Sequence, residues 1–186
     1  MRLTAFLGSP RKGGNTDILT EHVVEGARKA GIEVESIELR SLNIRGCIGC
    51  ERCWQVDGRP CAIADNMLPL YDTIANSDVL LFATPVYWYA PTAIMKAFID
   101  RLVPFNRPQG RPLIDGKRAI LVTAYEEEGP TAVEPVVRMF ELSFQYLGLS
   151  LVDKLIVDGV GPKGAVLDKP DVLERAYRVG AALADS

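Results

Sequence analysis

Apolar residues along this chain follow two alternating patterns. Short apolar runs have the length of buried strands, and longer segments carry apolar residues three or four positions apart, as on one face of a helix. The predicted strands cover residues 3–7, 32–39, 79–83, 119–122 and 151–157. The predicted helices cover residues 16–30, 66–76, 92–103, 133–147 and 172–183. The pattern therefore indicates a repeated alternation of strand and helix.

This alternation predicts an α/β fold. Continuous apolar strands are typical of a parallel sheet covered by helices on both faces. Right-handed crossovers then favour a doubly wound, five-stranded parallel sheet in three αβα layers, with strand order 2-1-3-4-5. We expect a single domain over residues 1–186, with a cysteine-rich loop of about residues 40–64 inserted after the second strand. Ligands of such folds bind at the carboxyl ends of the strands, near the switch point between strands one and three.

A glycine-rich turn over residues 8–16, Gly-Ser-Pro-Arg-Lys-Gly-Gly-Asn-Thr, joins the first strand to the first helix. Its glycines let the backbone approach an anion, and Asn15 or Thr16 is expected to cap the helix, whose N-terminal amides favour a phosphate. The turn lacks the spacing of nucleoside-triphosphate and dinucleotide loops. A phosphate monoester such as that of FMN fits best, and a plain polar turn is the alternative. The expected binding residues are Ser9, Arg11, Gly14, Asn15 and Thr16.

A second candidate surface follows the third strand. It consists of Thr84, Pro85, Val86, Tyr87 and Trp88, with Tyr89 next in the chain. A planar isoalloxazine ring stacks on such aromatic side chains, and backbone amides here can bond its polar edge. A dimer interface is the alternative interpretation. The loop after the fourth strand begins at Thr123 and is expected to form a third wall, with the glutamates at 126–128 on a solvated face.

All four cysteines lie within fifteen residues, at Cys47, Cys50, Cys53 and Cys61. Their spacing, C-x2-C-x2-C-x7-C, is typical of iron–sulfur ligation, in which four thiolates hold a [4Fe–4S] cluster. Zinc also accepts four thiolates, usually from two separated pairs, and free or disulfide-switching thiols are a third interpretation. Arg45 and Arg52 flank the loop, where they either offset thiolate charge or lie at the surface.

Composition and charge argue against nucleic-acid-binding, membrane-spanning and secreted classes of protein. The 186 residues include 24 acids and 21 bases, and the net charge of −3, without a long basic run, argues against nucleic acid as a partner. No apolar run has the length of a membrane span, and the short apolar start lacks a signal-peptide pattern. We therefore expect a cytoplasmic protein, whose cysteines stay reduced.

Two polar features are not expected to carry chemistry. His22, the single histidine, is interpreted as a packing or surface residue, so no histidine-based triad is available. Lys96, Asp100 and Arg101 are interpreted as a solvated or interface ion-pair face. Hydride transfer to a flavin needs no acid or base from the protein, so an enzyme without a catalytic side chain is expected.

Several motifs match a known family in the same order. They are Gly-Ser-Pro-Arg at 8–11 with Gly-Asn-Thr at 14–16, the cysteine loop, Asp-Asn-Met at 65–67, Ser-Asp at 77–78, Thr-Pro-Val-Tyr at 84–87 and Lys-Ala-Phe-Ile-Asp-Arg at 96–101. On these motifs the chain resembles the iron–sulfur flavoproteins and the related NAD(P)H-dependent FMN reductases of the flavodoxin-like superfamily.

The resemblance implies two redox centres. The implied contacts of FMN are Ser9, Arg11, Asn15 and Thr16 at the phosphate, and Pro85, Val86, Tyr87 and Trp88 near the ring. One [4Fe–4S] cluster on the four cysteines would exchange electrons with the flavin, although the seven-residue gap before Cys61 is long for cluster-binding members. The resemblance also implies a homodimer or homotetramer.

The expected function is that of an FMN-dependent oxidoreductase with a [4Fe–4S] cluster, which takes electrons from NAD(P)H or ferredoxin. A cluster-free NAD(P)H-dependent FMN or quinone reductase is the first alternative. A non-catalytic flavodoxin-type carrier is the second, which the modest net charge of −3 disfavours. An FMN-free interaction module with a zinc loop is the third, and the glycine-rich turn argues against it.

Overall fold

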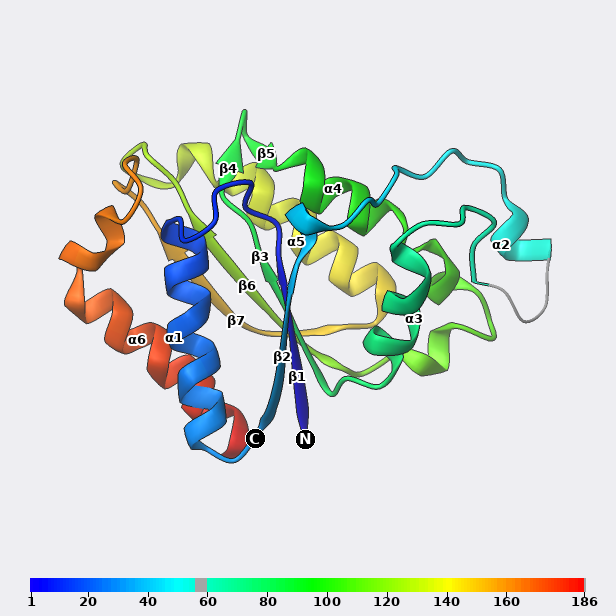
Figure 1. The fold of residues 1–186 in the computed structure, drawn as a ribbon, viewed down its shortest axis with the longest axis horizontal. Coiled ribbons are helices and arrows are strands. Elements are labelled where there is room, and N and C mark those ends of the chain that lie inside the picture. Colours follow the sequence, from blue (N-terminus) through cyan, green and yellow to red (C-terminus); the bar gives the residue numbers. More distant parts are fainter. Residues whose placement is uncertain (56–59, 186) are drawn as a thin grey trace.

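Five parallel strands run through the middle of the molecule in the order β2-β1-β3-β6-β7 (Figure 1). They are β1 (Arg2–Leu7), β2 (Glu33–Glu38), β3 (Val79–Ala83), β6 (Arg118–Ala124) and β7 (Ser150–Val157). The structure is a computed structural model that describes residues 1–55 and 60–185. Counted along the chain, the order of these strands is the predicted 2-1-3-4-5, and the fold class is confirmed.

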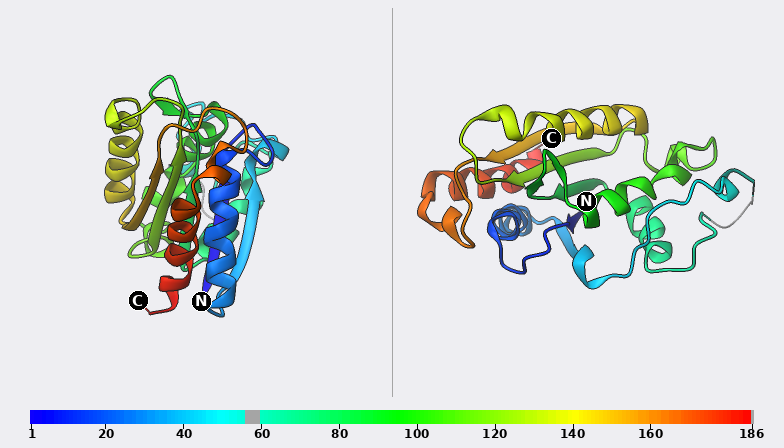
Figure 2. Two further views of the ribbon diagram at one scale, coloured as in Figure 1. Left: turned by 90° about the vertical axis from the view of Figure 1, so that its left-hand side faces the viewer. Right: turned by 90° about the horizontal axis from the view of Figure 1, so that it is seen from above.

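Helices cover both faces of the sheet, as the three-layer prediction requires (Figure 2). One face carries α1 (Asn15–Lys29) and α6 (Pro170–Ala181), and the other carries α3 (Met67–Ala75), α4 (Ala93–Asp100) and α5 (Glu134–Leu147). Neighbouring strand residues enter different cores: Ala5 packs with α1 and α6, whereas Phe6 packs with the helices of the other face. This alternation explains why the central strands β1, β3 and β6 are mostly apolar on both faces, whereas the edge strands β2 and β7 also carry charged residues.

Two glycines set the distance between α1 and α6. A Cβ atom on Gly26 would lie 2.0 Å from the carbonyl oxygen of Tyr177, and one on Gly180 would lie 1.8 Å from that of Val23. A larger residue at either position would push the helices apart. The two glycines therefore let α1 and α6 cover this face of the sheet together.

The register of the strands brings their carboxyl ends together. Leu7, at the end of β1, pairs with Ala83 at the end of β3, and Ala83 pairs with Val122 near the end of β6. The loops after these three strands therefore leave the sheet side by side, which places them at the switch point.

The sequence pattern does not predict the short antiparallel hairpin that follows β3. It consists of β4 (Val86–Tyr87) and β5 (Ala90–Pro91), and it projects above the strand ends in Figure 1. Two residues on each side are too few to leave a periodic signal in the sequence.

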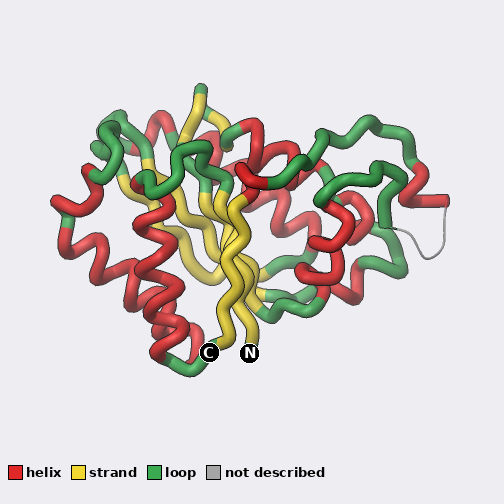
Figure 3. The backbone as a smooth tube through the Cα atoms, in the orientation of Figure 1, coloured by secondary structure: helices red, strands yellow, loops and turns green. Residues whose placement is uncertain are grey.

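From the end of β2, the described part of the predicted cysteine loop runs past α3 to the right-hand side of the molecule, where the next short helix lies (Figure 3, in the orientation of Figure 1). Its described part is irregular except for η1 (Leu39–Ser41) and α2 (Arg52–Gln55), and residues 56–59 of the predicted loop lie outside the described residues. The other single 3-10 turns are η2 (Val103–Asn106), η3 (Arg111–Leu113), η4 (Pro130–Ala132), η5 (Ala165–Asp168) and η6 (Ala182–Asp185). No helix in the described ranges is long and apolar enough to cross a bilayer.

Candidate functional site

A cleft lies at the carboxyl ends of β1, β3, β6 and β7, where ligands of doubly wound sheets bind. Eight of the eleven residues predicted to bind the cofactor line it, namely Ser9, Arg11, Gly14, Asn15, Thr16, Pro85, Val86 and Tyr87. The last residue of β6 and the loops after β6 and β7 supply the rest of the lining, namely Ala124, Tyr125, Glu126, Val160, Gly161 and Lys163. The structure thus gathers most of the predicted residues and adds a wall after β7 that the sequence analysis missed.

Short-range hydrogen bonds shape the glycine-rich turn after β1. Ser9 is buried, and its hydroxyl accepts a hydrogen bond from the N–H of Arg11 at 3.2 Å. The N–H of Gly14 donates to the carbonyl oxygen of Arg11 at 3.0 Å. The turn leads directly into α1, and the first N–H groups of a helix lack intrahelical partners and favour anions.

Helix α1 begins one residue earlier than predicted, which changes the role of Asn15. Gly14 is the N-cap and no side chain caps the helix, so the prediction of a cap by Asn15 or Thr16 is wrong. The Nδ2 of Asn15 instead donates to the carbonyl oxygens of Val160 at 2.7 Å and Pro162 at 2.8 Å. Its Oδ1 accepts from the N–H of Val166 at 3.3 Å. The side chain of Asn15 therefore holds the loop after β7 against the cleft.

That loop supplies a cation to the cleft. Lys163 lies over Gly13: a Cβ atom on this glycine would be 3.7 Å from Cε and 3.8 Å from Nζ of the lysine. Arg11 and Lys163 are the cations among the lining residues, and Glu126 is the carboxylate. In the sequence, the glycines at 159, 161 and 164 were the available signal for this loop. Nothing in the local sequence shows that the loop reaches the turn over residues 8–16.

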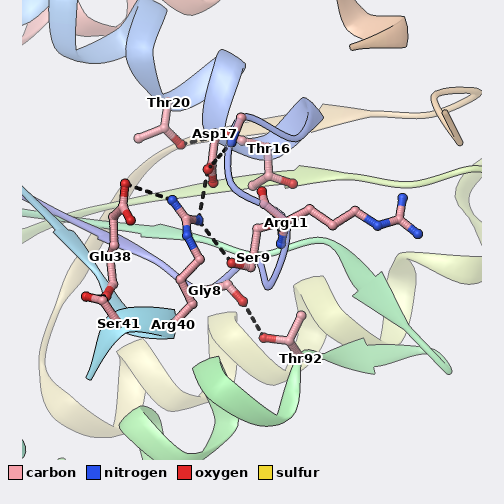
Figure 4. A network of polar contacts seen from close by, with 11 residues as sticks. Gly8, Ser9, Arg11, Thr16, Asp17, Thr20, Glu38, Arg40, Ser41 and Thr92 are labelled. Atoms are coloured by element: carbon pink, nitrogen blue, oxygen red, sulfur yellow. Dashed lines mark hydrogen bonds and ion pairs between the residues drawn. The ribbon is translucent and has the colours of Figure 1, made fainter. Parts of the chain in front are cut away.

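A polar network supports the turn from behind (Figure 4). Arg40, in η1, pairs with Asp17 in the first turn of α1 at 2.9 Å, and it donates to the carbonyl oxygen of Ser9 at 3.1 Å. Burial raises the pKa of Asp17, and the N–H of Gly13 and the guanidinium of Arg40 oppose that rise. The sequence analysis did not identify this network.

Thr84 and Thr123 are buried beneath the strand ends and do not line the cleft. Thr84 accepts a hydrogen bond at its hydroxyl from the N–H of Thr92 at 3.2 Å. Thr92 in turn caps α4 and donates to the carbonyl oxygen of Gly8 at 2.6 Å, which ties the turn after β1 to α4. The hydroxyl of Thr123 has no hydrogen-bond partner in the described part of the chain.

The aromatic run after β3 divides between the cleft and the solvent. Tyr87 lines the cleft, while Trp88 is 93% exposed at the tip of the β4–β5 hairpin, and Tyr89 is also exposed. Trp88 has φ +50° and Tyr89 has φ +61°, conformations that bulky residues rarely adopt. The structure therefore does not bring Trp88 into the cleft.

The four cysteines are separated from the cleft and are all unbridged. Cys47 and Cys50 are exposed, whereas Cys53 and Cys61 are partly buried. Among the described residues, no three His, Cys, Asp or Glu side chains are grouped so as to hold a metal ion. The residues in this arrangement do not fit a four-thiolate cluster, which needs all four sulfurs to converge.

A buried ion pair holds residues 45 and 65, the two ends of the cysteine segment, close together. Arg101 is 1% exposed and contacts both carboxylate oxygens of Asp65, at 2.8 and 3.1 Å. It also donates to the carbonyl oxygen of Arg45 at 2.7 Å. The interpretation of Arg101 as a solvated or interface residue is therefore wrong, because its side chain turns into the core. The Lys96–Asp100 pair, at 2.6 Å, lies on the partly exposed face as predicted.

A further contact holds the backbone at Cys53. Arg107 donates to the carbonyl oxygen of Cys53. Burial raises the pKa of the Cys53 thiol, and Cys61 and Cys47 raise it further.

A doubly wound five-stranded parallel sheet of this strand order is the flavodoxin-like fold. A family model described as NADPH-dependent FMN reductase matches residues 1–148. The chain belongs to this family.

Two relatives are similar to this chain over most of its length, and a solved structure shares its fold. An iron–sulfur flavoprotein of Archaeoglobus fulgidus is 31% identical over 186 residues, which is 100% of this chain and 80% of the relative. A Bacillus subtilis protein named as an NAD(P)H-dependent FMN-containing oxidoreductase is 28% identical over 183 residues, or 96% of each chain. The NAD(P)H:quinone oxidoreductase from Methanothermobacter marburgensis shares the fold, with a TM-score of 0.79, 23% identity, and coverage of 98% of this chain and 96% of that one. The protein is an FMN-dependent oxidoreductase.

The residues of the cleft fit FMN. The lining of the cleft as a whole has two cations, Arg11 and Lys163, against one carboxylate, Glu126, which suits a phosphate monoester. Pro85, Val86 and Tyr87 from the loop after β3 and Tyr125 from the loop after β6 supply apolar and aromatic surface for a planar ring.

Proposed function

We propose that this protein transfers electrons from a nicotinamide donor, through FMN in the cleft, to a small-molecule or protein acceptor. The observation that supports this most directly is the convergence of four strand-end loops on one cleft, cationic at β1 and apolar after β3. When bound, FMN would supply two-electron hydride acceptance and one-electron release.

The residues of the chain would bind and orient the cofactor. Ser9, Arg11 and the first amides of α1 would hold the phosphate, with Lys163 as a second cation. Pro85, Val86 and Tyr87 would exclude water from one edge of the ring. No protein acid or base is assigned, since hydride transfer to a flavin needs none.

The cysteine segment is proposed as the binding site of an iron–sulfur cluster. The spacing of the four cysteines supports this, as does the name of the relative from Archaeoglobus fulgidus. Because the described thiols are not grouped, this proposal requires the segment to rearrange around the iron. A cluster-free reductase is the second candidate, which the separation of the thiols favours.

Self-association is proposed as well. Trp88 and Tyr89 are large aromatic side chains exposed next to the cleft, and a second copy covering the hairpin would remove apolar surface from water. Sedimentation velocity would measure the mass of the assembly.

The first experiment is anaerobic purification followed by a visible spectrum, iron and sulfide counts, and an assay of NADH and NADPH oxidation. Bound flavin with turnover supports the oxidoreductase, and about four irons per chain supports the cluster. A Cys61→Ser variant should then lose iron and keep flavin. Flavin without iron would contradict the proposed cluster and leave a cluster-free reductase. Bound flavin without oxidation of NADH or NADPH would contradict the proposed nicotinamide donor.

A further inference from the structure

A buried carboxylate directly follows the glycine-rich turn over residues 8–16, where the phosphate of FMN is proposed to bind. Asp17 is in the first turn of α1, and its side chain is 3% exposed. Its Oδ2 accepts a hydrogen bond from the N–H of Gly13 at 2.9 Å, and so it shapes the turn at a residue with φ +65°. Its Oδ1 is buried without a hydrogen-bond partner in the described part of the chain. The residue that shapes the turn is therefore a carboxylate one position from Thr16, which lines the cleft, and a negative charge there would repel the proposed phosphate.

Arg40 is the cation paired with this carboxylate. Its Nη1 lies 2.9 Å from Oδ2 of Asp17 and 3.1 Å from the carbonyl oxygen of Ser9, and its Nη2 lies 2.9 Å from Oε1 of Glu38 (Figure 4). The side chain of Arg40 is 12% exposed, so water screens the pair weakly. One guanidinium thus joins the turn after β1, the first turn of α1 and the end of β2.

Arg40 is placed behind the turn and is not among the residues that line the cleft. Arg11 and Lys163 do line the cleft, and neither forms an ion pair with Asp17 in the described part of the chain. The charge of Asp17 is therefore balanced by a residue that does not face a ligand in the cleft.

We infer that Arg40 is a positioning residue for the phosphate of FMN. It neutralises Asp17, so that this carboxylate can hold Gly13 in place without repelling the phosphate, and it fixes the Ser9 carbonyl at the other end of the turn. This inference rests on the proposed binding of FMN in the cleft. It makes Arg40, which does not line the cleft, a residue that sets the preference for FMN over riboflavin.

The experiment compares affinities for FMN and riboflavin, which differ in the phosphate, by titration calorimetry on the full chain freed of flavin. The variants are Arg40→Met, Asp17→Asn and the double variant Asp17→Asn with Arg40→Met. An asparagine keeps a carbonyl oxygen for the Gly13 N–H but carries no charge. Arg28→Met, which removes an exposed cation from the other end of α1, controls for the change in net charge.

Arg40→Met should weaken FMN binding by about tenfold or more, while the affinity for riboflavin changes little. The double variant should recover most of the FMN affinity, and Arg28→Met should bind both flavins as the unaltered protein does. If Arg40→Met fails to fold, the two variants that carry Asp17→Asn still test the inference. The single variant Asp17→Asn and the double variant should bind FMN with similar affinity, because neither contains the carboxylate that Arg40 offsets. Equal losses for FMN and riboflavin, or no recovery in the double variant, would overturn the inference. An unaltered protein that binds flavin without preferring FMN would contradict the phosphate assignment itself.

Discussion

Two residues at the tip of the β4–β5 hairpin show how single positions store strain near the cleft. Trp88 and Tyr89 both have positive φ, which the two central residues of a type I′ turn require and which Asn-Gly satisfies at low cost. For other L-residues this region costs roughly 1–2 kcal/mol each. Since both side chains are exposed, burial within the chain offsets little of that cost. Strain of this kind is typical of functional surfaces.

Replacing the strained pair should stabilise the fold. Trp88→Asn combined with Tyr89→Gly should raise the free energy of unfolding by on the order of 1–2 kcal/mol, because the turn is then built from residues that adopt positive φ readily. Urea denaturation measures the change. The matched control, Trp88→Tyr with Tyr89→Phe, keeps the strain and should show no gain. A double variant no more stable than this control would mean that the turn is not strained.

At the scale of elements, the two ends of the connection between β2 and α3 are held together by Arg101 at the end of α4. Besides the contacts of Arg101, the N–H of Arg45 donates to Asp65 at 3.0 Å, and Asn43 and Asn66 bond to each other at 2.8 and 3.2 Å. Burial alone raises the pKa of Asp65, but Arg101 and two backbone N–H groups lower it below its ordinary value of 3.8. The ionised carboxylate therefore stabilises the fold above pH 3.8, and this contribution is lost as the pH falls through the lowered pKa.

Removing this ion pair should open the cysteine segment. Arg101→Met alone leaves a buried carboxylate unpaired, so the Asp65→Leu, Arg101→Met double variant is the cleaner change. In reduced, iron-free protein, Cys53 and Cys61 should then react with a thiol reagent about tenfold faster or more. The exposed Cys47 and Cys50 are internal references, and Lys96→Met is the control on the exposed side of α4. Unchanged labelling of Cys53 and Cys61 would show that other contacts hold the segment.

At the scale of the whole molecule, the cleft exists only when the sheet is complete. Its lining comes from the loops after β1, β3, β6 and β7, which are separated by up to about 150 residues and meet through the parallel register. An unfolded chain has no such site, so ligand binding must stabilise the folded state by mass action.

FMN at a free concentration one hundred times its Kd should therefore raise the free energy of unfolding by about 2.7 kcal/mol. Urea denaturation with and without FMN measures this, and the same concentration of riboflavin should stabilise less because it lacks the phosphate. Stabilisation by neither flavin would contradict a cleft formed by the folded sheet.

Local signals were sufficient for much of the fold and part of the candidate site. The strand runs and helical spacings predicted the sheet order, because burial on both faces of a parallel sheet leaves a continuous apolar signal. The turn over residues 8–16 was recognisable because its glycines and short polar residues follow one another directly between a strand and a helix. The β4–β5 hairpin, with two residues on each strand, left no comparable signal.

Contacts between distant segments were decided by the tertiary structure. Arg40 with Asp17, Asn15 with the loop at 160–166, and Arg101 with Asp65 each join residues 23 or more positions apart. Their residue types occur equally on solvated surfaces, so the sequence alone did not separate the buried Arg101 from its exposed neighbour Lys96. The sequence determined the order of the elements and the glycine-rich turn over residues 8–16, because periodicity and turn-forming residues act over a few positions. Only the fold decided which charges are buried and paired, because burial and pairing depend on which segments the sheet brings together.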